Sequence, residues 1–312
     1  MEAPPLIAVV GPTASGKSEL ALDLVDHLGG PEAAEIVSAD AMQLYRGMDI
    51  GTAKVPLADR RGIAHHQIDV LDVRDEASVA AYQREARADV AHIRARGRIP
   101  VLAGGSGLYL RAVLDQLEFP GTDTAIRAEL EARAETVGGP ALHAELRAAD
   151  PEAAASIDAR NVRRTIRALE VVQLTGRPFS ASLPTYTYAL PAIQLGLQVP
   201  REELDRRITA RATQMMDDGL LQETEGLLAS GLAEGRTASG AVGYSQAIDV
   251  LAGRLSVAEG THAIALATRQ LARRQIKWFR RDPRIHWLPA GEGPGPQLLR
   301  SAVAALDDRD EA

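Results

Sequence analysis

Cysteine is absent from this 312-residue chain, and aromatic residues make up only 4% of it. The lack of cysteine excludes disulfides, thiolate zinc sites and cysteine nucleophiles, and it suits a reducing compartment. The sequence also lacks any stretch near the ~20 apolar residues of a transmembrane helix. An apolar, strand-like run starts at Leu6, which leaves no room for a signal peptide. We therefore expect a soluble cytoplasmic protein without membrane contact, built on a core of Leu, Val, Ile and Ala.

Positive charge is in the minority, since the formal net charge is −7. An acidic chain argues at first against a nucleic-acid partner. The basic residues are unevenly placed, however, with four arginines and no acid in residues 160–167, and six basic residues and no acid in residues 269–281. Because salt screens each charge beyond about 10 Å, such local clusters attract polyanions even on an acidic protein.

The most informative segment is Gly11–Ser18, which matches the phosphate-loop pattern G-x-x-x-x-G-K-[ST] at every specified position. An apolar run at 6–10 precedes it, and Leu20, Leu24 and Leu28 follow at helical spacing. Strand, loop and helix together predict a cradle whose backbone N–H groups face a phosphate, with the Lys17 cation and a Mg²⁺ ion on the Ser18 hydroxyl. The residues predicted to bind phosphate are Gly11, Pro12, Thr13, Ala14, Ser15, Gly16, Lys17 and Ser18.

Short apolar runs alternate with helical patterns, which predicts an α/β fold with a parallel sheet flanked by helices. Residues 121–192 are rich in Ala, Glu and Arg and indicate an inserted all-helical domain. The core is thus expected in two parts, 1–120 as the first part of a P-loop-type α/β core and 193–312 as its completion with C-terminal helices. Strands are expected at residues 6–10, 35–39, 99–103 and 193–199, and a helix at residues 79–93.

The C-terminal third reads as helices from residue 201 to 281 with breaks near three glycines. A loop rich in Gly and Pro follows at 289–296, and the acidic end after Asp307 is expected to fray. The glycines are Gly219, Gly231 and Gly243.

Polar residues follow the predicted strands at the sheet edge where ligands of α/β proteins bind. Asp40 comes directly after the second strand, so its carboxylate could hold magnesium or act as a general base, or could cap a short helix. The glycines of segment 104–109 allow close approach to a ligand, although a turn into a helix explains them equally well. His65 and His66 are neighbours pointing to opposite sides, which favours a structural role over a shared metal.

Each basic cluster fits a helix with a basic face and an apolar stripe. Arg160, Arg163, Arg164 and Arg167 fall on one arc, with Val162, Ile166 and Leu169 opposite; the later cluster shares one face, with Leu271, Trp278 and Phe279 opposite. A solvated face normally mixes charges of both signs, so binding of a nucleic-acid backbone is the favoured interpretation. The later cluster comprises Arg269, Arg273, Arg274, Lys277, Arg280 and Arg281.

Eight motifs in order resemble those of the tRNA dimethylallyltransferases (isopentenyl-pyrophosphate transferases), and the resemblance covers nearly the whole chain. The motifs are GPTASGKS at 11–18, SADAMQLY at 38–45, MDIGTAK at 48–54, HHQID at 65–69, GGSGLY at 104–109, RRTIRALEV at 163–171, VGYSQ at 242–246 and RRQIKWFR at 273–280.

The resemblance implies transfer of a dimethylallyl group from its diphosphate to N6 of the adenosine adjoining the anticodon of tRNA on the 3′ side, with Mg²⁺ as cofactor. It also implies that the helical insertion grips the anticodon stem. Catalytic roles fall on Asp40 toward the adenine amine, Thr13 toward the bridging oxygen, and Lys17 and Arg211 toward the diphosphate. The implied tRNA contacts are Asp40, Ala41, Met42, Gln43, Ser106, Arg127, Arg163, Arg164, Arg167, Arg273, Arg274, Lys277 and Arg280.

The chain departs from the family pattern in a few places. Ser245 stands where the family usually has Arg, and Gly240 where a basic residue is frequent, which puts RNA contacts of that segment in doubt. The alternative functions are a P-loop kinase of nucleotides or small molecules, with arginines near residue 163 closing over ATP, and a non-catalytic RNA-binding switch. We expect a monomer.

Overall fold

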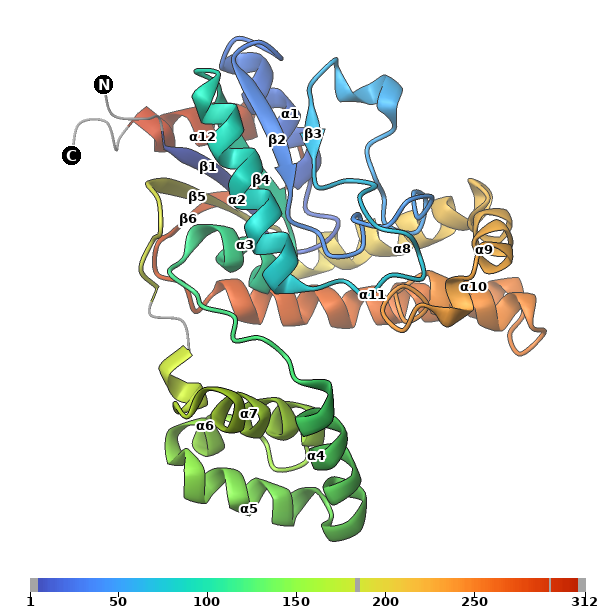
Figure 1. Ribbon diagram of the computed structural model, residues 1–312. Helices are drawn as coiled ribbons and strands as arrows, with labels where there is room; N and C mark the ends of the chain where they lie inside the picture. The colour runs from blue at the N-terminus through green and yellow to red at the C-terminus, as the bar shows by residue number, and fades with distance from the viewer. Residues whose placement is uncertain (1–4, 183–185, 292, 308–312) are drawn as a thin grey trace. The chain divides into compact units, whose positions relative to one another are not determined.

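The computed structural model describes residues 5–182, 186–291 and 293–307 and divides into two compact units (Figure 1). The sheet unit comprises Met1–Leu114 and Tyr188–Ala312, and the helical unit comprises Asp115–Thr187. Within the described ranges, no helix is both long and apolar enough to cross a lipid bilayer. The end after Asp307, expected to fray, lies outside the described residues.

The sheet unit is built on one six-stranded sheet in which every pair of neighbours is parallel. The order is β3-β2-β4-β1-β5-β6, so the first strand lies inside the sheet. All five residues of β1 and of β2 are buried, as expected for strands with helices on both faces. The α/β fold with a parallel sheet is confirmed. The strands are β1 Leu6–Val10, β2 Ala34–Ser38, β3 His65–His66, β4 Ile99–Gly104, β5 Ala192–Gln198 and β6 Ile285–Pro289.

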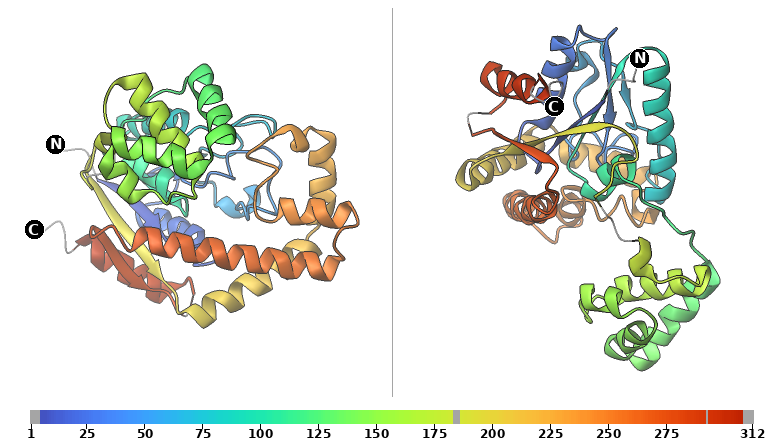
Figure 2. Two further views of the ribbon diagram at one scale, coloured as in Figure 1. Left: turned by 90° about the horizontal axis from the view of Figure 1, so that it is seen from below. Right: turned by 90° about the vertical axis from the view of Figure 1, so that its left-hand side faces the viewer.

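Helices cover both faces of this sheet (Figures 1 and 2). Helix α2 (Val79–Ala95) covers one face, with Tyr82, Ala86, Val90 and Ile93 buried at helical spacing. Helices α1 and α12 cover the other face, where their leucines and alanines share a core with β1, β2 and β5. The remaining bounds are α1 Lys17–His27, α3 Gly107–Leu114 and α12 Pro296–Asp307, with a 3₁₀ turn, η1, at Leu57–Arg60.

A second core of the sheet unit lies among the helices after β5, where α8 and α11 run side by side (Figure 1). Glycines in left-handed conformation (φ 97–100°) cap the N-termini of α9 and the 3₁₀ turn η3, and Gly243 with φ 99° caps α10. The predicted glycine breaks are thus confirmed. The bounds are α8 Arg201–Asp217, α9 Leu220–Ala229, η3 Leu232–Glu234, α10 Tyr244–Leu251 and α11 Val257–Phe279.

The helical unit has a core of its own, made by Leu130, Leu142, Leu146, Ile166 and Leu169 and their neighbours. The amphipathic pattern of the sequence explains it, because one apolar stripe of each helix is buried. Its elements are α4 Thr124–Val137, α5 Gly139–Ala149, α6 Pro151–Ser156, α7 Val162–Thr175 and η2 Phe179–Ser182.

The strands β3 and β6, the helix α12 and the 3₁₀ turn η1 of the sheet unit lie outside the predicted set. In β3, His66 Nε2 lies 2.7 Å from Oε2 of the buried Glu35, and Nδ1 lies 3.6 Å from Asp89. The interaction with the Asp89 carboxylate, together with the hydrogen bond with Glu35, outweighs burial and raises the pKa of His66. His66 therefore has the structural role that the sequence favoured, and Nδ1 of His65 lies 2.9 Å from the Ile63 carbonyl oxygen.

Candidate active site

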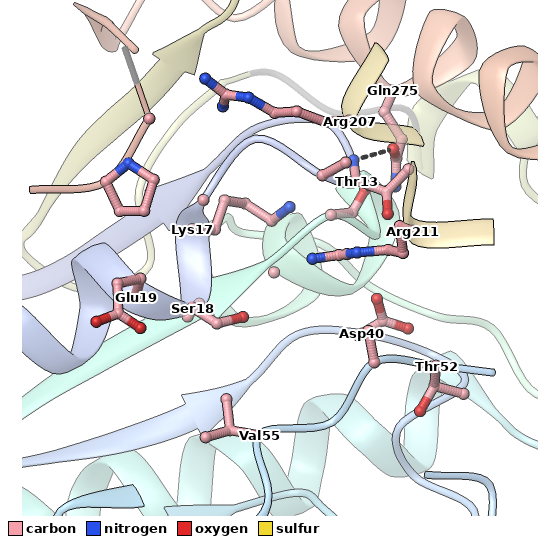
Figure 3. A pocket seen from close by; sticks show the side chains of 18 of the residues that line it. Thr13, Lys17, Ser18, Glu19, Asp40, Thr52, Val55, Arg207, Arg211 and Gln275 are labelled. Atoms are coloured by element: carbon pink, nitrogen blue, oxygen red, sulfur yellow. Dashed lines mark hydrogen bonds between the residues drawn. The ribbon is translucent and has the colours of Figure 1, made fainter. Parts of the chain in front are cut away.

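The carboxyl ends of β1, β4 and β2 are neighbours in the sheet, and the segments that follow them open onto one cleft of about 600 Å³ (Figure 3). Helix α8, Gln275 of α11 and residues 293–294 after β6 supply the remaining walls. Thr13, Lys17, Asp40 and Arg211 all line this cleft, so the structure brings the four predicted catalytic residues together. Other lining residues are Ala14, Gly16, Ser18, Glu19, Gln43, Thr52, Val55, Gly104, Gly105, Glu203, Arg206 and Arg207.

The phosphate loop joins β1 to α1 in a conformation that its sequence makes accessible. Gly16 has φ 94°, and an added Cβ there would meet Pro294 at 3.2 Å, so the position requires glycine. Ser15 is fully buried, and its Oγ has no hydrogen-bond partner among the described residues. Lys17 Nζ donates to the Pro12 carbonyl at 2.7 Å, which folds the ammonium back over the loop. An anion in the cradle would supply acceptors for these donors.

Three charged side chains converge in the cleft, as Figure 3 shows: Lys17 from α1, Arg211 from α8 and Asp40 from the segment after β2. Burial lowers the pKa of Lys17 to about 8, an effect that the negative charge of Asp40 opposes and the positive charge of Arg211 strengthens. Two of the cations of the cleft, Lys17 and Arg211, therefore face the Asp40 carboxylate.

Asp40 sits in a turn, because residues 41–44 form turns rather than a helix. One carboxylate oxygen accepts a hydrogen bond from the Met42 N–H at 3.0 Å, so the helix-cap interpretation is wrong and the carboxylate closes a turn. Ser106 Oγ accepts from the Ala41 N–H at 3.1 Å, and the Gln43 amide donates to the Thr52 carbonyl at 3.2 Å. Backbone and side-chain contacts thus fix the segment on both sides of Asp40.

Several cleft residues were not predicted from the sequence. Arg207 lies one helical turn before Arg211 on α8, pairs with Glu203 at 2.6 Å and donates to the Gly291 carbonyl at 2.7 Å. Gln275 of α11 accepts from the Thr13 N–H at 2.8 Å, the contact that is dashed in Figure 3. The spacing of Arg207 and Arg211, four residues apart, is a signal that they share a helix face, whereas Gln275 lies within a segment whose arginines and lysine predict a basic surface.

The oxygen donors of the cleft suit Mg²⁺, which prefers one or two protein oxygens together with substrate phosphates. Ser18 is exposed at the cleft beside the phosphate loop, and the Asp40 carboxylate lies on the facing wall. Nowhere among the described residues do three or more His, Cys, Asp or Glu side chains gather into a metal site. The residues present therefore fit an ion that a bound diphosphate helps to hold.

The basic face of α11 remains on the surface. Arg273, Arg274, Lys277 and Arg280 are exposed, whereas Phe279 on the other side of the helix is buried. Arg269 is half-buried and donates to the Thr209 hydroxyl at 3.2 Å. Four of the predicted RNA contacts thus form one exposed basic patch, which we call the α11 patch.

In the helical unit, the predicted RNA contacts are divided between exposed arginines and arginines that pair with a buried acid. Arg163 and Arg164 are exposed on α7. Arg127 and Arg167 both pair with the fully buried Glu170, at 2.7 and 2.9 Å. The prediction of a helical face of four arginines without a compensating acid is wrong, because Arg160 precedes α7 and pairs with Asp158 at 2.9 Å, and Arg167 has Glu170.

These features define a phosphate-loop α/β protein whose anion cradle faces a carboxylate across a single cleft. Such a class covers both group-transfer enzymes and nucleotide hydrolases. Comparison with known proteins identifies the family within this class.

The profile of the family described as IPP transferase matches residues 43–282. A tRNA dimethylallyltransferase of a Nocardioides species is 57% identical over 97% of this chain and 96% of its own length. The crystal structure of a tRNA isopentenylpyrophosphate transferase from Bacillus halodurans, 35% identical, covers 98% of both chains with a TM-score of 0.70. A eukaryotic dimethylallyltransferase acting on tRNA, 25% identical, matches with a TM-score of 0.78 over 92% of this chain and 74% of its own. The chain belongs to the IPP transferase family.

Proposed function

We propose that this protein transfers a dimethylallyl group from dimethylallyl diphosphate to N6 of the adenosine next to the anticodon of tRNA, on its 3′ side. The bond between the allylic carbon and the bridging oxygen breaks, a bond from N6 to that carbon forms, and pyrophosphate leaves. Family membership supports the reaction class, since the relatives are tRNA dimethylallyltransferases. The observation that carries the mechanism is the single cleft in which the phosphate loop faces Asp40.

The phosphate side of the cleft stabilises the leaving group. Charge on the diphosphate grows as the bond to carbon breaks, so donors that are fixed in advance lower the barrier. The N–H groups of the phosphate loop, the Lys17 ammonium and the Arg211 guanidinium supply this field, and the Thr13 hydroxyl faces the bridging oxygen. Mg²⁺ held on Ser18 would neutralise part of the diphosphate charge.

The carboxylate side prepares the nucleophile. We assign to Asp40 a hydrogen bond from the exocyclic amine, which orients the nitrogen lone pair toward the allylic carbon. After the new bond forms, the nitrogen is cationic, and Asp40 takes its proton. This role needs an ionised carboxylate that is open to the cleft, and the half-buried Asp40 meets the second condition.

The target base must leave the stacked anticodon loop to reach this cleft, which costs a few kcal/mol. Contacts with the RNA backbone offset this cost, and the exposed cations of the α11 patch and of α7 suit that role. We assign Arg163 and Arg164 to direct phosphate contact. Arg127 and Arg167, paired with Glu170, would contribute a partly neutralised charge. We assign further RNA contacts to Ser106 and to the segment 40–43.

The test is incubation of the protein with dimethylallyl diphosphate labelled in its allyl group, Mg²⁺ and unmodified tRNA. We expect label in the tRNA, a prenylated adenosine after digestion, and one pyrophosphate per transfer. A tRNA with guanosine at the target position is the matched control and should remain unlabelled. A kinase would instead convert ATP to ADP and leave dimethylallyl diphosphate intact, which would refute the proposal.

We also propose that the working form is a cytoplasmic monomer. The cytoplasm holds the tRNA acceptor, and the residues assigned to catalysis, Thr13, Lys17, Asp40 and Arg211, meet in this cleft without a residue that a second copy would have to supply. Sedimentation of the free protein and of its tRNA complex should give masses of one protein chain per particle.

A further inference from the structure

Gln275 makes two hydrogen bonds that join separate parts of the cleft. Its Oε1 accepts from the backbone N–H of Thr13 in the phosphate loop at 2.8 Å. Its Nε2 donates to the backbone carbonyl of Gly105 at 3.0 Å, in the turn after β4. One amide side chain from α11 therefore ties together two segments that lie about 90 residues apart in the sequence. Both donor and acceptor of the amide are used, so its orientation is fixed by these contacts.

The turn that receives Gln275 leads directly to the carboxylate side of the cleft. Ser106 Oγ accepts from the Ala41 N–H at 3.1 Å, and the Ser106 N–H donates to the Ala39 carbonyl at 3.2 Å. These two bonds flank Asp40. A continuous path of four hydrogen bonds, all within the sheet unit, thus runs from Thr13 through Gln275 and Ser106 to the residues on either side of Asp40.

Glycine at position 105 is a condition of this path. A Cβ built there would lie 2.6 Å from Gln275 Nε2, closer than any side chain tolerates, although φ of Gly105 is not in the left-handed region. The backbone conformation does not require glycine at this position. Glycine is required because the Gln275 amide occupies the space that a Cβ atom would fill.

We propose that Gln275 is a positioning residue that sets the separation between the Thr13 side and the Asp40 side of the cleft. The proposal rests on the proposed function, because it assigns the leaving oxygen to Thr13 and the attacking nitrogen to Asp40. Displacement needs the attacking nitrogen ~3–3.5 Å from the allylic carbon that the leaving oxygen departs from, and an error near 1 Å in this placement can cost ~10²-fold in rate. A residue that fixes both sides at once therefore controls kcat more than affinity.

The first test replaces Gln275 with Met, which keeps the length of the side chain and removes both hydrogen bonds. We expect kcat for prenyl transfer to fall by ~10–100-fold, with the Kd for tRNA within about twofold of the parent. The matched control is Gln270→Met, at an exposed position on the same helix, which should leave kcat unchanged. A purely structural role would lower the melting temperature without changing kcat per folded molecule.

A second variant reaches the same contact from its other partner and leaves α11 intact. Gly105→Ala should displace the Gln275 amide and lower kcat by a similar factor, so the test does not depend on the folding of one variant. The double variant Gln275→Met with Gly105→Ala should be no slower than the slower single variant, because both changes break one path. Independent, multiplying effects would overturn the proposal.

A third comparison asks whether Gln275 acts through Thr13. In a Thr13→Ala background, the hydroxyl that needs positioning is gone, so Gln275→Met should cost less than it does in the parent. An equal cost in both backgrounds would contradict the proposed path. If the parent transfers the prenyl group and Gln275→Met matches its kcat, the role of Gln275 alone is refuted; an inactive parent refutes the proposed function together with it.

Discussion

The pKa of Lys17 leads to a prediction about pyrophosphate binding that depends on one charge. A pKa of about 8 lies well below the usual 10.5, because the loop buries the ammonium and Arg211 repels it, while Asp40 only partly compensates. Raising the pH through 8 therefore removes the positive charge of Lys17 from the cradle. Lys17 is then about nine-tenths charged at pH 7 and about one-tenth charged at pH 9.

If only the charged form binds pyrophosphate, the affinity falls with the charged fraction. We expect the Kd of free enzyme for pyrophosphate to rise by about tenfold between pH 7 and pH 9, equivalent to about 1.4 kcal/mol. A lysine with an ordinary pKa would stay charged over this range, and its Kd would change little. Isothermal titration calorimetry at fixed ionic strength measures the difference.

The Lys17→Arg variant is the control, because a guanidinium stays charged at pH 9. It also corrects for proton loss by pyrophosphate itself, which both proteins experience equally. The ratio of parent Kd to variant Kd should rise with pH. A ratio that stays constant from pH 7 to pH 9 would refute the reasoning, since Lys17 would then not titrate in this window.

Three further predictions concern the carboxylate, the α11 patch and the histidine of β3. Asp40→Asn should lower kcat by ~10²–10⁴-fold in the labelled-transfer assay while the tRNA Kd is unchanged; a parental rate would exclude Asp40 as base. Lys277→Ala should weaken tRNA binding and reduce the slope of log K against log salt by about 0.9, whereas Arg84→Ala, an exposed change on α2, should not. The raised pKa of His66 means that its charge stabilises the fold below pH 6.5 and that this contribution is lost as pH rises through the folded-state pKa. His66→Gln should therefore destabilise the protein more at pH 5.5 than at pH 8.5 in urea denaturation, and equal losses would contradict the ion-pair assignment.

The parts of the fold that the sequence predicted are those with local signals. Strand β1 and the loop after it form a complete motif within thirteen residues, Leu6–Ser18, and α2 shows its buried face at regular spacing. Strand β6 had no such signal, since Ile-His-Trp-Leu-Pro is short, ends in proline and alternates only partly. Helix α12 begins at Pro296, the last residue of the segment predicted as a loop, and no element is predicted from the sequence for residues 297–307.

The site residues that the sequence did not predict also lack a local signal. The sequence predicts uncompensated arginines on α7 because no acid lies among them, yet Glu170 follows one helical turn after Arg167 and pairs with Arg127 of α4 as well. Gln275 carried no charge and no motif of its own, so its contact with Thr13, 262 residues away, was not predictable. Contacts with residues distant in sequence determine these roles, and the pattern of a single sequence does not predict such contacts.

The wall of the cleft opposite the phosphate loop depends on the same kind of distant contact. The Glu223 carboxylate of α9 accepts from the N–H groups of Asp49 and Ile50 at 3.2 and 2.9 Å, and Tyr244 donates its hydroxyl to it at 2.5 Å. These bonds hold the segment that continues into Thr52, a residue of the cleft. The phosphate loop, by contrast, lies between its own strand β1 and helix α1, and Gln275 adds one distant contact through the Thr13 N–H. The phosphate-loop motif is therefore compatible with a disrupted cleft. The loop is built mainly from neighbouring residues, whereas the opposite wall forms only when α9 and α10 are folded.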